Sequence, residues 1–143
     1  MKKLCICVVF TNSLIDIPAN FDHEIILRVS EVHIYSVYIV TNPQATVLYT
    51  GVTNSLCQRL IEHWTSRGKT ASFAGKYFCF NLLYYEDFPY IKDAIAREKE
   101  IKGWSRSKKV ELIKSFNPDW LFLNAAICDG WPPKEIPTVS GNR

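Results

Sequence analysis

The chain has 143 residues, a formal net charge of +3 at neutral pH and 48% hydrophobic residues, which is typical of a globular protein with one domain. No apolar run approaches the roughly 20 residues that a membrane-spanning helix needs, so we expect no membrane association. The apolar stretch in MKKLCICVVF ends too early for a secretory signal peptide. We therefore expect a cytoplasmic protein.

The cysteines support the same compartment. They are odd in number, scattered and without a CxxC pair, which argues against a zinc site and against a disulfide framework. We predict that they are reduced and mostly buried thiols. The five are Cys5, Cys7, Cys57, Cys79 and Cys128.

Charge and motif content divide the chain. Residues 1–33 have a net charge of −1 and no motif that we can interpret, whereas the residues after them have a net charge of +4. The end of the chain is rich in proline and poor in apolar residues, which is typical of a mobile segment. We predict an N-terminal extension of unknown role over residues 1–33, a domain over residues 34–128 and a mobile tail over residues 129–143.

Two strands and a turn open the domain. Residues 34–41 and 47–53 alternate apolar, β-branched and aromatic side chains, which predicts strands. Asn42-Pro43 between them is a turn signal, because proline fixes φ and has no N–H to donate.

The expected register brings two tyrosines together. If Thr41 pairs with Thr46 across a four-residue loop, Tyr38 stands directly opposite Tyr49 on one face of the hairpin. Such a pair has two interpretations. It is either an aromatic cross-strand pair that stabilises the hairpin, or part of an active site.

A helix is predicted after the hairpin. Leu56, Leu60 and Trp64 recur at a spacing of four and give it an apolar stripe. Arg59 and His63 are also four apart, so they share a different face of the same helix.

Three further elements follow. Residues 78–87 are too apolar and aromatic for a loop and predict a third strand, and residues 90–102 and 106–116 predict two helices. The complete prediction is an α/β protein of the α+β kind. Its small central, mainly antiparallel three-stranded sheet is flanked by helices, in the order β-β-α-β-α-α.

Glu98 lies on the apolar stripe of its helix, seven residues after Ile91 and three before Ile101. A buried carboxylate is costly unless it is paired, hydrogen-bonded or bound to a metal. Glu98 therefore either pairs with a lysine, reaches solvent or holds a metal. With Tyr38 and Arg59 it would suit phosphodiester cleavage, in which metal and arginine stabilise phosphate charge and a tyrosine or histidine moves the proton.

A basic segment lies near Glu98. Six basic residues and two acidic residues fall between Lys99 and Lys114. This segment is either a phosphate-binding patch or a solvated helix face.

Three stretches in order, YSVYIV…VLYTGVTNSLCQRLIEHW, KYFCFNLLYYEDF and AIAREKEIKGWSRSKKVELIKSFNPDW, resemble a GIY-YIG nuclease domain. The resemblance covers residues 34–123. It is strongest to the small single-domain bacterial branch, which is related to the N-terminal domain of the excision-repair incision subunit. Ser36 replaces the glycine of the first motif and Thr50 replaces the isoleucine of the second.

The resemblance implies a role for each matching residue. Tyr38 matches the proposed general base, and Tyr49 matches the second-motif tyrosine that lines the site. Arg59 matches the catalytic arginine and His63 a frequent active-site histidine. Glu98 matches the glutamate that holds a divalent metal, Mg²⁺ or Mn²⁺.

Further residues are expected to bind substrate. Gly51 is implied to keep the strand end open beside the phosphate, Lys76 and Tyr77 match a recurrent Lys-Tyr pair, and Asn117 opens the NPDW segment. The basic segment adds Lys102, Arg106, Lys108 and Lys109.

The leading hypothesis is a metal-dependent DNA endonuclease acting in DNA repair, with nucleic acid as its partner. The alternatives are a nucleic-acid-binding module without catalysis and a plain interaction protein, although the latter leaves the inward glutamate unexplained.

Overall fold

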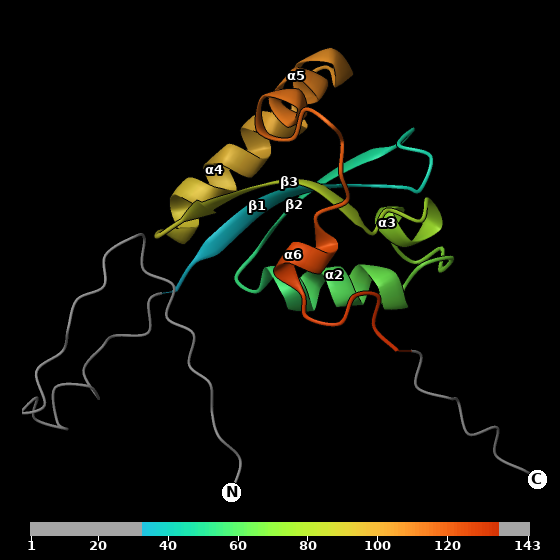
Figure 1. Cartoon of the computed structure of the whole chain (residues 1–143). Coiled ribbons are helices and arrows are strands. Elements are labelled where there is room, and N and C mark those ends of the chain that lie inside the picture. Colours follow the sequence, from blue (N-terminus) through green and yellow to red (C-terminus); the bar gives the residue numbers. More distant parts are fainter. Residues whose placement is uncertain (1–32, 135–143) are drawn as a thin grey trace, which may run out of the picture. The chain divides into compact units, whose positions relative to one another are not determined.

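Three segments with alternating side chains form the sheet in the computed structural model, which describes residues 33–134 (Figure 1). The strands are β1 (Tyr35–Thr41), β2 (Leu48–Thr53) and β3 (Asn81–Phe88), in the order β2-β1-β3, and both pairs are antiparallel. The predicted fold class is confirmed. Residues 1–32 of the predicted N-terminal extension, with Cys5 and Cys7, and the last nine residues of the tail lie outside the described residues.

Helices cover both faces of the sheet (Figure 1). They are α2 (Leu56–Thr65), α3 (Phe73–Lys76), α4 (Ile91–Lys102), α5 (Arg106–Phe116) and α6 (Asn124–Ile127). Because side chains alternate along a strand, Val37 and Ile39 of β1 pack toward α4 and α5. Tyr38 and Val40 pack toward α2, α3 and α6. The central strand thus contributes to two separate cores.

The register of the hairpin differs from the prediction. Tyr38 pairs with Gly51, and Tyr49 pairs with Val40, so the two tyrosines are diagonal neighbours rather than direct partners. They still share a face, because a shift of two residues preserves the alternation. The loop is longer than expected because the Asn42 side chain organises it.

Asn42 acts as the centre of the turn. Its Oδ1 accepts hydrogen bonds from the backbone N–H groups of Thr46 at 2.8 Å and Val47 at 3.0 Å. The Asn42 carbonyl also accepts from the N–H of Ala45 at 2.9 Å. These bonds keep residues 42–47 out of the strand ladder, so pairing begins at Leu48.

The start of β3 and the presence of α3 also differ from the prediction. Phe78 has a φ of 57°, a left-handed conformation that does not continue a strand, and pairing begins only at Asn81. Residues 73–76 form a short helix where no element was expected, and the Ser72 side chain accepts a hydrogen bond from the N–H of Gly75. Helix α5 has the predicted bounds.

Two buried asparagines complete the outer edge of β3. Asn124 accepts from the N–H of Leu82 and donates to the carbonyl of Phe80, each at 2.8 Å. Asn117 donates to the carbonyls of Leu83 and Leu121 and accepts from the Leu121 N–H. Both N–H groups of Asn117 therefore serve the backbone, and its role in substrate binding stays a prediction.

Two cysteines correct the prediction of reduced thiols. Cys57 of α2 and Cys128 after α6 form a disulfide with a Cα–Cα distance of 5.2 Å, whereas Cys79 is a buried free thiol. The 71-residue separation hides this pair in the sequence. Trp131, in the segment predicted to be mobile, contacts the ring of Trp64 with 5.6 Å between centroids.

Within residues 33–134, no helix is long and apolar enough to cross a membrane.

Candidate functional site

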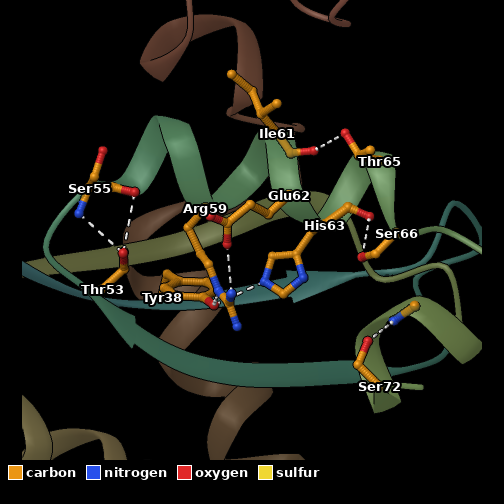
Figure 2. Close-up of polar contacts among 11 residues, drawn as sticks. Tyr38, Thr53, Ser55, Arg59, Ile61, Glu62, His63, Thr65, Ser66 and Ser72 are labelled. Carbon is orange, nitrogen blue, oxygen red and sulfur yellow. Dashed lines mark hydrogen bonds and ion pairs between the residues drawn. The ribbon is translucent and has the colours of Figure 1, made fainter. Parts of the chain in front are cut away.

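A buried tyrosine hydroxyl lies at the centre of the candidate site (Figure 2). Tyr38 projects from β1 toward α2, and its side chain has no exposed surface. Its Oη lies 2.9 Å from Nε2 of His63 and accepts a hydrogen bond from Nε of Arg59 at 3.2 Å. Because Arg59 and His63 are one turn apart on α2, they share a face of the helix, as their spacing predicted, and both reach the same hydroxyl.

The direction of these hydrogen bonds follows from the chemistry of the groups. A guanidinium only donates, so Oη is an acceptor toward Arg59 and retains its own proton for His63. Burial, reinforced by the charge of Arg59, lowers the pKa of His63 to about 4. His63 is therefore neutral at pH 7, and its Nε2 accepts a hydrogen bond from the phenol O–H.

The phenol itself is held in the neutral form. Burial raises the pKa of Tyr38 to about 12, although the hydrogen bond and charge of Arg59 oppose that rise. At neutral pH Arg59 thus donates a hydrogen bond to Tyr38, and Tyr38 donates one to His63.

Glu62 is a residue that the sequence prediction missed. Its Oε2 accepts from Nη1 of Arg59 at 2.7 Å, and both side chains are partly exposed. The spacing of three on one helix was a usable signal for this pair. The ion pair orients the guanidinium beside Tyr38.

Gly51 has a packing role that the resemblance did not imply. It lies directly across from Tyr38 in the ladder. A Cβ built at this glycine would lie 2.6 Å from Cζ of Tyr38 and would also collide with Oη. The missing side chain therefore makes room for the phenol to cross β2.

Tyr49 joins the same cluster through its ring. It meets the ring of His63 edge-on with 5.5 Å between centroids, and it stacks on Phe73 of α3 at 6.2 Å. Phe73 in turn contacts Tyr77 at 4.6 Å, and Nζ of Lys76 lies 5.3 Å from the Tyr77 ring centroid. Phe73 was missed because α3 was not predicted.

Glu98 is buried on the inner side of α4, as the apolar stripe predicted. Its carboxylate forms an ion pair with Lys102 one turn later, which is one of the alternatives that the sequence left open. Helix α4 covers the face of the sheet opposite to α2 (Figure 1). The contacts that join Tyr38, Arg59 and His63 therefore do not include Glu98.

The predicted basic patch has several local functions. Arg106 donates to the carbonyls of Thr46 at 2.8 Å and Ala45 at 3.1 Å, which ties α5 to the β1–β2 loop. Lys108 lies over the Trp104 ring at 4.0 Å, and Nζ of Lys109 donates to the carbonyl of Lys102 at 3.3 Å. These cations belong to α4 and α5, whereas Lys76 belongs to α3 on the other face.

The sequence of the chain is similar to a family model and to several known proteins. The family model of the GIY-YIG catalytic domain matches residues 34–111. A UPF0213 protein of Staphylococcus saprophyticus is 36% identical over 77 residues, which is 54% of this chain and 90% of that protein. A UPF0213 protein of Pediococcus acidilactici is 37% identical over 68 residues, 48% of this chain and 69% of that protein.

A solved structure is also similar. The solution NMR structure of a UPF0213 protein from Bacillus halodurans is 27% identical, with a TM-score of 0.41, and the match covers 64% of this chain and 95% of that one. The family match spans β1 through the first half of α5. It includes the residues of the candidate site, which are Tyr38, Tyr49, Arg59 and His63. The chain therefore belongs to the GIY-YIG family of nuclease domains.

Proposed function

We propose that this domain hydrolyses phosphodiester bonds in DNA. The observation that carries the proposal is the hydrogen-bonded series from Arg59 through Tyr38 to His63. It joins a cation, a hydroxyl and a neutral proton acceptor at one point, which are the groups that phosphodiester hydrolysis requires.

Arg59 would bind the phosphate. The contacts to Tyr38 and Glu62 engage two of its five N–H groups, and 40% of the side chain is exposed. The remaining donors are available to a phosphoryl oxygen. They would stabilise it most strongly as negative charge develops in the transition state.

Tyr38 and His63 would move the proton. As water attacks phosphorus, one of its protons would pass to Oη of Tyr38 while the phenol proton passes to Nε2 of His63. The P–O bond to one strand end would break, and the leaving oxygen would take a proton from solvent to become a hydroxyl. A neutral phenol accepts a proton only if it releases its own, and His63 is placed to receive it at 2.9 Å. Because Tyr38 is buried, we expect phosphate to draw Arg59 away from Oη and admit the water.

A divalent cation, Mg²⁺ or Mn²⁺, is part of the proposal, with Glu98 as its protein ligand. Within residues 33–134 no group of three or more His, Cys, Asp or Glu side chains forms a metal site. A single carboxylate fits a cation that keeps most of its waters. The cation would supply positive charge to a phosphate oxygen that reaches Glu98, although α4 lies across the sheet from Arg59, and Lys102 would have to release Glu98 to admit it.

A second candidate function is nucleic-acid binding without catalysis. It is favoured by Glu98 itself, which is already neutralised by Lys102 on the face of the sheet away from Tyr38. Such a module would retain its cations and bind DNA while cleaving nothing.

Cleavage of labelled single-stranded, duplex and branched DNA tests the choice. We expect cleavage with Mg²⁺ or Mn²⁺, none with EDTA, and at least about a hundredfold slower cleavage by Glu98→Gln. Glu111→Gln on the exposed side of α5 removes the same charge and should cleave normally. DNA binding by the wild type without metal-dependent cleavage would establish the binding module instead.

A further inference from the structure

Helix α3 and the residue that follows it expose two aromatic rings beside the candidate site. Phe73 is 53% exposed and Tyr77 is 40% exposed, although their rings contact each other at 4.6 Å between centroids. The row continues inward, because Phe73 stacks on Tyr49 with an interplanar angle of 23° and Tyr49 meets His63 edge-on. We call Tyr49, Phe73 and Tyr77 the aromatic row.

The backbone of α3 fixes these rings in place. Ala74 and Gly75 are buried, and a Cβ at Gly75 would lie 2.6 Å from the carbonyl oxygens of Ser66 and Lys69. The Gly75 carbonyl accepts from the N–H of Gly68, which ties α3 to the chain after α2. Tight packing on one side of the helix therefore leaves Phe73 and Tyr77 on the exposed side.

We infer that the aromatic row is a stacking surface for unpaired nucleobases next to the cleaved phosphate. This inference rests on the proposed function, since it names the substrate class of the same site. A single exposed ring is ordinary on a protein surface. This pair differs because it is continuous with His63 through Tyr49.

The charge beside the row suits a nucleic-acid strand. Nζ of Lys76 lies 5.3 Å from the centre of the Tyr77 ring, so a cation for a backbone phosphate accompanies the flat surface for a base. Proteins that bind single strands combine stacked aromatic side chains with positive charge, and every base offers a flat face. A continuous duplex keeps its bases stacked inside the helix and cannot use this surface. The expected substrate is single-stranded or carries unpaired nucleotides at a branch or flap.

Binding in EDTA tests the inference separately from cleavage. The probes are a fluorescein-labelled thymidine oligonucleotide and a hairpin duplex of the same length. Loss of one stacked base weakens binding by about 5- to 150-fold, so Phe73→Ala and Tyr77→Ala should each lose that much affinity for the single strand and little for the duplex. Phe73→Trp and Tyr77→Phe should retain it. Phe122→Ala, which removes a ring exposed to 47% elsewhere, is the matched control.

A base analogue gives a direct signal of stacking. A single 2-aminopurine in the oligonucleotide should lose fluorescence on binding to the wild type and to Phe122→Ala, and much less on binding to Phe73→Ala. Equal losses of single-strand and duplex affinity, or unchanged affinity in both ring variants, would overturn the inference. So would a wild type that prefers the duplex. A wild type that quenches 2-aminopurine but cleaves nothing would refute only the nuclease activity.

Discussion

The ring and the hydroxyl of Tyr38 have different surroundings. Its ring fills a core position between β1 and α2, while Oη joins Arg59 and His63. Packing and hydrogen bonding therefore reside in separable parts of one side chain. The direct pairing of Tyr38 with Tyr49 that the sequence predicted is not formed, whereas a part in an active site stays a prediction.

Removing that hydroxyl should separate the two roles. We expect Tyr38→Phe to remain folded, with a stability change of about 1 kcal/mol for the lost hydrogen bonds. Its cleavage should be at least about a hundredfold slower, because the path for the proton is lost. Rates under single-turnover conditions and urea unfolding measure the two effects. Tyr35→Phe alters the same strand on its other face and is the control. A normal rate in Tyr38→Phe would make His63 the direct base.

The neutral state of His63 makes stability depend on pH. Its pKa is about 4 in the folded protein and 6.5 as the ordinary value, so the unfolded chain binds the proton more readily between these limits. The contribution of His63 to stability is therefore complete above pH 6.5. It decreases as the pH falls from 6.5 to about 4. Urea unfolding at pH 7 and pH 5 should show a larger loss for the wild type than for His63→Gln. An equal loss in both would mean that His63 is not buried in the neutral form.

At the scale of elements, the alternating pattern predicted the strands and their faces but could not define the register. Alternation repeats every two residues, so it does not distinguish Tyr38 opposite Tyr49 from Tyr38 opposite Gly51. The hydrogen bonds that determine the register come from the side chain of Asn42. In the sequence, Asn42 indicates a turn but does not indicate how many residues the loop contains. Helix α3 was missed because its four residues are too few for a helical period.

The Arg106 contact between α5 and the β1–β2 loop should appear as stability. Arg106→Ala removes two hydrogen bonds to the carbonyls of Ala45 and Thr46, so we expect a loss of about 1 kcal/mol in unfolding free energy. Lys114→Ala, an exposed change on the same helix, should leave stability nearly unaltered. Equal stability of the two variants would show that the contact does not hold the loop.

For the whole molecule, the candidate site was predictable where it is local and unpredictable where it depends on the tertiary fold. The spacing of four residues was enough to predict that Arg59 and His63 share one face of α2. The separation of Glu98 from Tyr38 by the sheet required the placement of α4, which no spacing within the chain encodes. The same holds for the disulfide, since only the return of α6 to α2 brings Cys57 and Cys128 together.

The cations of α4 and α5 should act on DNA as a group. Changing Lys102, Lys108 and Lys109 to Gln while retaining Arg106 should weaken binding to all sequences alike. It should also flatten the salt dependence by about 0.9 in log–log slope for each DNA phosphate that the protein no longer neutralises. Fluorescence anisotropy at several salt concentrations measures both effects. An unchanged slope would define these cations as a solvated helix face.

Reduction of the disulfide should lower global stability. A cross-link that closes a long loop typically contributes about 2–4 kcal/mol by restricting the unfolded chain. We expect dithiothreitol to lower the urea midpoint by the corresponding amount and to have no effect on the Cys57→Ser, Cys128→Ser double variant. Equal midpoints of the oxidised and reduced wild type would contradict this expectation.

Gly51 and Tyr38 belong to different sequence motifs, but steric contact makes the residue allowed at one position depend on the other. The phenol occupies the space of the absent Cβ, with only 2.6 Å from that position to Cζ. The glycine of the second motif is thus the complement of the tyrosine of the first. A descendant that lost the aromatic ring would free the glycine position to vary, whereas one that kept the ring would not. Covariation between these two positions across related chains would therefore record which lineages still hold the hydroxyl in place.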